Sequence, residues 1–131
     1  MENENSQENK APVVAEPANA DNIVTYDEFS KIELRVAQIL SAERVTKSEK
    51  LIKMQLTLGD ILGERQIVAG IGKYYTPEEL VGRKIIVVAN LKPVKLMGLE
   101  SKGMLLAASE GDTSVALLSV DPLMPAGAKV R

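Results

Sequence analysis

The stretch IIVVANLKPVKLMGLESKGMLLAAS, residues 85–109, decides how this chain is organised. Its first part, Ile85–Leu91, is an apolar run with one polar residue, which is typical of a buried strand. Lys92-Pro93 ends that strand, because proline has no N–H to donate and restricts the residue before it. Two glycines permit tight bends further on, and an apolar strand resumes at Met104–Ala108.

The loop between these two strands is basic and carries polar side chains. A basic loop held by rigid strands is more typical of a recognition site than of a plain connection. Asn90 needs hydrogen-bond partners, and either a loop-bracing or an RNA-facing role would supply them. Met97 could contact a ligand, although methionine more often fills gaps in a core or an interface. The candidate contact residues are Asn90, Lys92, Lys95, Met97, Ser101 and Lys102.

The composition excludes most catalytic chemistry. The 131 residues allow one domain with a modest core. The absence of cysteine rules out disulfides and thiolate metal sites, and the absence of histidine removes the usual acid–base catalyst. No nucleophile–base pair or metal cluster is evident, so we expect a non-catalytic chain without a cofactor. No apolar run is long enough to span a membrane and no signal peptide is evident, so we expect a cytoplasmic protein without a membrane partner.

Charge divides the chain into two parts. Residues 1–22 carry a net charge of −4, and the remaining residues carry +2. The first part is rich in Glu, Asn, Ala and Pro and has no apolar periodicity, so we predict a disordered linker or tail over 1–22. The ordered domain is predicted over 23–131.

Apolar alternation and turn residues predict an all-β domain with two short helices. Thr25 and Glu28 have the spacing of a capping box, which predicts a helix to Lys31 with Phe29 and Ile32 facing inward. Thr76, Pro77 and Glu79 predict a second helix that ends at Gly82. The predicted strands are Ile32–Val45, Ile52–Leu58, Arg65–Ile71, Lys84–Leu91 and Gly103–Ser109, with a further short strand at Val115–Val120.

Five strands with a short helix between the third and the fourth describe a five-stranded OB-fold barrel, here with a C-terminal strand extension. OB-folds bind ligands across strands 2 and 3, between the loop joining strands 1 and 2 and the loop joining strands 4 and 5. Cations gather at both loops, and further ones lie on the first two strands. They are Arg35, Arg44, Lys47, Lys50 and Lys53, together with Lys92, Lys95 and Lys102 of the second loop.

The few aromatic residues restrict the kind of nucleic acid that this surface suits. Proteins that bind single strands without sequence preference stack bases on aromatic side chains, and only three tyrosines and one phenylalanine are present. Lysines and loop amides that contact the phosphates of a folded RNA are therefore the more plausible arrangement. Gly70-Ile71-Gly72-Lys73 is not a phosphate-binding loop, because Ile67 and Tyr74 stand where that motif needs Gly and Ser or Thr.

The motif at 90–104, NLKPVKLMGLESKGM, resembles the tRNA-binding domain. Ile32–Val36, Lys50-Leu51 and Arg65–Ile71 are also similar to that family, so the resemblance covers about residues 25–131. The segments Tyr74–Gly82 and Pro125–Arg131 look most like the C-terminal appendix of bacterial methionyl-tRNA synthetases. Lys102 departs from the family pattern, in which we expect Gln.

The resemblance implies an OB-fold that binds the outer corner of tRNA without reading its anticodon. It also implies a homodimer formed by the C-terminal extension, and a synthetase catalytic domain as a covalently linked partner. The sequence supports a self-complementary surface independently, because its C-terminal part has more apolar side chains than a small barrel obviously buries. The predicted dimer residues are Val115, Leu117, Leu118 and Leu123.

Three other interpretations remain open at this stage. The chain could be a free-standing tRNA-binding protein. It could bind unfolded peptides at the apolar loop tip Leu96–Leu99, as the family's small dimeric members that look like secretion chaperones imply. It could also serve only to dimerise.

Overall fold

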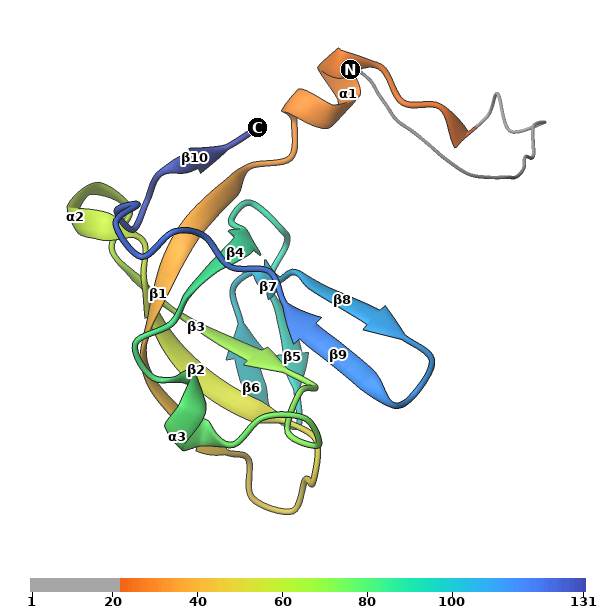
Figure 1. Cartoon of the computed structure of the whole chain (residues 1–131), viewed down its shortest axis with the longest axis vertical. Helices are drawn as coiled ribbons and strands as arrows, with labels where there is room; N and C mark the ends of the chain where they lie inside the picture. The colour runs from red at the N-terminus through yellow and green to blue at the C-terminus, as the bar shows by residue number, and fades with distance from the viewer. Residues whose placement is uncertain (1–21) are drawn as a thin grey trace. The chain divides into compact units, whose positions relative to one another are not determined.

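The computed structural model describes residues 22–131 (Figure 1). The predicted tail over 1–22 lies outside these residues, apart from its last position. The described chain falls into two compact units, one ending at Lys31 and the other covering Ile32–Arg131. Within the described part, no helix is long and apolar enough to cross a membrane.

The first unit contains α1 (Tyr26–Ser30), and its capping box is confirmed. The Thr25 hydroxyl accepts from the Glu28 N–H at 3.1 Å, and the Glu28 carboxylate accepts from the Thr25 N–H at 2.8 Å. The prediction that Phe29 and Ile32 face inward is wrong, since their exposed fractions are 36% and 46%. A helix of five residues makes little more than one turn, and α1 buries none of its side chains.

The second unit is a curled antiparallel sheet, which confirms the predicted all-β OB-like fold (Figure 1). Its strand order is β3-β2-β1-β4-β7, and β10 pairs with the start of β1. The bounds are β1 (Leu34–Arg44), β2 (Ile52–Thr57), β3 (Glu64–Ala69), β4 (Lys84–Val88), β7 (Met104–Leu105) and β10 (Lys129–Val130).

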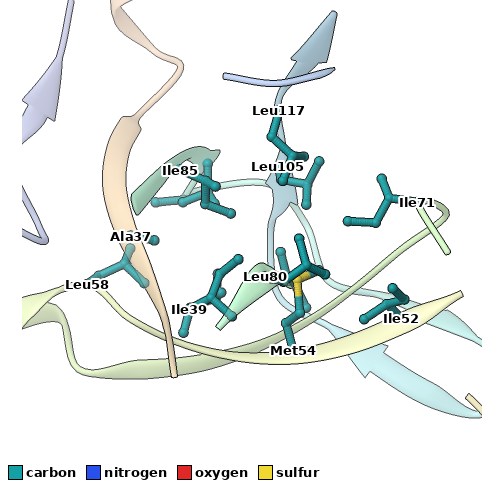
Figure 2. Close-up of a cluster of buried hydrophobic side chains, with 14 residues drawn as sticks. Ala37, Ile39, Ile52, Met54, Leu58, Ile71, Leu80, Ile85, Leu105 and Leu117 are labelled. Carbon is teal, nitrogen blue, oxygen red and sulfur yellow. The ribbon is translucent and has the colours of Figure 1, made fainter. Parts of the chain in front are cut away.

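Alternating apolar residues build the core of the barrel. Ile52, Met54 and Leu56 of β2 are at most 1% exposed, and the residues between them face outward. The predicted helix is confirmed as α3 (Pro77–Leu80), whose Leu80 side chain is fully buried among the strand residues (Figure 2).

The structure adds detail to the predicted strands and loops in three places. Residues 59–62 form a single helical turn, α2 (Gly59–Leu62), and the fourth strand ends at Val88 instead of Leu91. The loop after Pro93 is itself a hairpin of β5 (Val94–Leu96) and β6 (Leu99–Ser101). Met97 and Gly98 have φ values of 50° and 81°, the positive pair that a tight type I′ hairpin turn requires.

The predicted strand over Gly103–Ser109 is split at Leu106. Its first part is β7 in the barrel, and its second part is β8 (Ala107–Glu110), which forms a separate hairpin with β9 (Ser114–Leu117). The Leu106 N–H donates to Ile86, while its carbonyl accepts from Leu118, so the backbone changes partner at this residue. The strand predicted at Val115–Val120 therefore corresponds to β9, which contains the buried Leu117, whereas β8 is exposed throughout.

Candidate nucleic-acid interface

The β5–β6 hairpin is fixed to the edge of β3 by hydrogen bonds. Ser101 is 2% exposed, and its hydroxyl accepts from the Val68 N–H at 3.0 Å and donates to the Gly103 carbonyl at 3.1 Å. The Lys102 N–H donates to the Gln66 carbonyl, and the Gln66 side chain donates to the Glu100 carbonyl, both at 2.9 Å. These bonds satisfy the free edge of β3 and hold the hairpin in one position.

An apolar cluster brings the hairpin and the first basic loop together. Val45, Leu51 and Val68 form this cluster, and Leu96 and Leu99 of the hairpin pack against it. Val45 and Leu51 flank the loop between β1 and β2 that carries Lys47 and Lys50, so this loop lies beside the hairpin that carries Lys95.

The predicted cations divide into two groups. Lys47, Lys50, Lys92 and Lys95 are exposed, and none of them makes an ion pair within residues 22–131. The second group is paired: Arg35 with Glu33 at 2.5 Å, Lys53 with Glu43 at 3.1 Å and Lys102 with Glu100 at 4.0 Å. The first group therefore carries the charge that is available to an anionic ligand.

Arg44, which belongs to neither group, and Arg35 of the paired group also donate to backbone carbonyls elsewhere. The Arg44 guanidinium donates to the Gly72 carbonyl at 2.9 Å, which ties the end of β1 to the loop after β3. Arg35 donates to the Gly127 carbonyl at 3.1 Å and lies eight residues from Glu43 along β1, about 26 Å at the rise of an extended strand. The structure therefore does not bring Arg35 together with the hairpin. Its guanidinium, hydrogen-bonded to Glu33, holds the pKa of that carboxyl below its usual range.

Asn90 lies in the turn after β4, where its side-chain oxygen accepts from the Glu33 N–H at 2.8 Å. This bond links the start of the basic loop to the chain just before β1. Of the two roles left open by the sequence, the geometry favours the bracing one for Asn90. The buried Ser101 hydroxyl likewise holds the loop from inside.

A cavity of about 250 Å³ lies between the end of β1 and the tip of the hairpin. Its lining includes the predicted site residues Lys53 and Met97, and Met97 is 57% exposed. Four other lining residues were not among the predicted RNA contacts: Glu43, Val45, Thr46 and Leu99. The alternation of inward and outward residues on the first predicted strand could have placed Glu43 on the ligand-binding face. Nothing in the sequence, however, indicated that Glu43 lies opposite Lys53 on the next strand. Within residues 22–131, no group of three His, Cys, Asp or Glu side chains could hold a metal ion.

Comparison with known proteins decides the family. The model of the tRNA-binding domain matches residues 34–129. The chain belongs to the tRNA-binding domain family. This confirms the family predicted from the motif at 90–104.

Relatives of this tRNA-binding domain include methionine–tRNA ligases, a MetRS-related protein and a CsaA chaperone protein. The methionine–tRNA ligase of Thermotoga maritima is 56% identical over 118 residues, which is 89% of this chain and 18% of that ligase. The chain thus spans less than a fifth of that relative's length. A MetRS-related protein of Pyrococcus horikoshii is 42% identical with a TM-score of 0.79, and the match covers 83% of this chain and 98% of that one. A CsaA chaperone protein of Picrophilus torridus is 34% identical with a TM-score of 0.76, over 83% and 100% of the two chains.

Proposed function

We propose that this domain binds folded tRNA without catalysing a reaction and belongs to a methionine–tRNA ligase of the cytoplasm. The observation that supports the proposal is the fixed β5–β6 hairpin, which carries Lys95 and packs through Leu96 and Leu99 beside the loop that carries Lys47 and Lys50. Exposed lysines that make no ion pair within residues 22–131 suit phosphate contacts, which position an RNA without reading its sequence. Membership of the tRNA-binding domain family and the sequence identity to methionine–tRNA ligases support the same function.

Fluorescence anisotropy tests this proposal with total tRNA, a single-stranded RNA and a duplex RNA at two salt concentrations. We expect a preference for tRNA that falls steeply with salt, because phosphate contacts release counterions. Equal or absent binding of the three RNAs would contradict the proposal and favour a peptide-binding role, which the printed description of the Picrophilus relative as a chaperone makes the next to test.

Replacing both Lys92 and Lys95 with alanine should weaken binding to all tRNAs alike. We expect the slope of log affinity against log salt to decrease by about one for each phosphate that the variant no longer neutralises. The double variant Lys129→Ala, Arg131→Ala removes the same charge outside the hairpin and should leave the slope nearer to that of the unchanged protein. Equal effects of the two double variants would show that only net charge matters.

We further propose that the domain forms a homodimer through the predicted residues 115–123. Leu118 and Leu123 are 38% and 90% exposed, whereas Val115 is half-buried and Leu117 packs within the core. The barrel therefore buries some of the apolar side chains that the sequence analysis assigned to a dimer surface. The exposed part that remains is Leu118, Leu123 and the neighbouring Met124, which is 45% exposed.

Sedimentation equilibrium tests the dimer. Leu118→Asp and Leu123→Asp should each shift the protein toward the monomer, because a buried unpaired carboxylate opposes association. Ile61→Asp is the matched control, since Ile61 is 96% exposed on α2 and lies outside the proposed interface. A wild-type monomer, or dissociation only by Ile61→Asp, would refute this assignment.

A further inference from the structure

The cavity between β1 and the hairpin combines apolar side chains with a charged edge, and Arg44 and Thr46 complete its lining. Its volume of about 250 Å³ equals that of roughly eight water molecules, which is room for one nucleobase. Val45, Met97 and Leu99 supply the apolar lining. The positive φ of Met97 fixes its backbone at the hairpin tip, and a thioether packs well against an aromatic ring.

The charged edge is the pair formed by Glu43 and Lys53. These residues face each other across β1 and β2, and the Lys53 ammonium lies 3.1 Å from Oε2 of Glu43. No hydrogen bond within residues 22–131 reaches Oε1 of Glu43, and the ammonium retains two further N–H donors. The lysine side chain is 28% exposed and the carboxylate 67% exposed, so both are open to a ligand.

A carboxylate repels the phosphates of an RNA. Its presence on a surface that binds phosphates is therefore unfavourable unless it contacts another part of the RNA. As an exposed ion pair it would contribute little to stability. A carboxylate accepts hydrogen bonds and donates none, so it suits the part of a nucleobase where two donors stand side by side. Unpaired RNA bases are commonly bound in this way, by stacking and by hydrogen bonds to their Watson–Crick edges.

We propose that this cavity binds one unstacked guanine base of the RNA, a proposal that rests on the RNA-binding function above. The guanine N1–H and N2 amino group donate to the Glu43 carboxylate, and the O6 atom accepts from the Lys53 ammonium. Adenine and cytosine each place a ring nitrogen acceptor beside their amino group, where it faces the carboxylate unfavourably. Uracil offers a single N–H between two carbonyl groups. Guanine is therefore the base whose edge matches the pair.

The test uses the full chain and stem-loop RNAs whose loops are all uridine except at one position. That position carries guanosine, inosine, adenosine or uridine, and binding is followed by fluorescence anisotropy. We expect guanosine to bind about five- to ten-fold more tightly than uridine, near the lower end for a bidentate contact because the pair is partly exposed. Inosine lacks the 2-amino group and should fall between them. Equal binding of guanosine and inosine RNAs would overturn the proposal without any mutation.

Glu43→Gln separates base recognition from general electrostatics. This variant removes a negative charge, so it should strengthen binding of the uridine loop while bringing the guanosine preference to within two-fold. Glu78→Gln removes the same charge from α3, outside the cavity lining, and should keep the preference. A guanosine preference that survives Glu43→Gln would overturn the assignment of the cavity.

The remaining outcomes distinguish this proposal from the one on which it rests. If tRNA binds with a steep salt dependence but the four loop RNAs bind alike, the guanine site is refuted and the tRNA-binding function stands. If no RNA binds, both are refuted. Guanosine monophosphate should not compete at micromolar concentration, because a free nucleotide lacks the phosphate contacts of the loop. Saturation at that concentration would identify a mononucleotide site and overturn the assignment to RNA.

Discussion

Replacing Gly127 with alanine is expected to lower the melting temperature of the domain by more than about 10 °C, as a free-energy loss of about 3 kcal/mol implies for a chain of this size. Gly127 has a φ of 93°, and a Cβ there would lie 2.4 Å from the Leu58 carbonyl oxygen. The obstacle is backbone, so a side-chain rotation does not relieve it. The C-terminal segment would have to leave the barrel.

Leaving the barrel costs the hydrogen bonds that fix this segment to β1. The Gly127 N–H donates to the Val36 carbonyl at 2.7 Å, and the Val36 N–H donates to the Ala128 carbonyl at 2.9 Å. Each contributes about 1 kcal/mol, and the hydrogen bond from the Arg35 guanidinium to the Gly127 carbonyl, which has a charged donor, contributes about 1.5 kcal/mol more. The variant should therefore also lose amide protection at Val36 in hydrogen exchange.

Gly111→Ala is the matched control for this prediction. Gly111 has a φ of 61°, but a Cβ added there would meet nothing within 4 Å. Gly111→Ala should therefore lose only the free energy of placing alanine in a left-handed backbone conformation, about 1–2 kcal/mol. Similar melting temperatures for the two variants would show that the close approach to Leu58 does not matter.

The barrel was predictable because its signals are local. Ile52, Met54 and Leu56 alternate with polar residues, so period-two patterning alone identified β2 and its buried face. The Thr76–Glu79 capping box identified α3 in the same way. Both signals depend on residues close in sequence, and tertiary contacts reinforce them.

The hairpin within the basic loop was not predictable from the same signals. Its turn is Met97-Gly98, whereas the usual type I′ turn begins with Asn, Asp or Gly. Methionine at a positive φ is tolerated here because Leu96 and Leu99 on either side are held by the apolar cluster. The break at Leu106 carries no glycine or proline, so nothing marked the change of partner there.

The cations of the candidate site were predicted from the sequence, but the ion pairs that some of them form were not. The lysines of the two basic loops were identified from charge and fold, yet the pairing of Lys53 with Glu43 depends on the register that the loop between β1 and β2 sets. The alternation of apolar residues within each strand does not give that register. The cations that are free to meet a ligand therefore become apparent only from the structure.

Replacing Ser101 with alanine is expected to destabilise the domain by about 2 kcal/mol and to weaken tRNA binding, although Ser101 itself is nearly inaccessible to a ligand. The substitution leaves the buried Val68 N–H and the Gly103 carbonyl without the hydroxyl that they share. A buried polar group without a partner costs about 1–3 kcal/mol. The hairpin would then be held to β3 mainly through Gln66 and the apolar cluster.

Two measurements on Ser101→Ala separate its structural effect from its effect on binding. Thermal unfolding gives the decrease in stability, and tRNA anisotropy well below the melting temperature gives the decrease in affinity. Ser109→Ala is the control, because Ser109 is an exposed serine on β8 whose replacement should change neither value. We expect the salt slope of Ser101→Ala to decrease as well, because a loosened hairpin no longer holds Lys95 beside the loop that carries Lys47 and Lys50. Lower stability with an unchanged slope would mean that the lysines bind independently of the hairpin's position, and the rigid surface on which the proposed function rests would then be unnecessary.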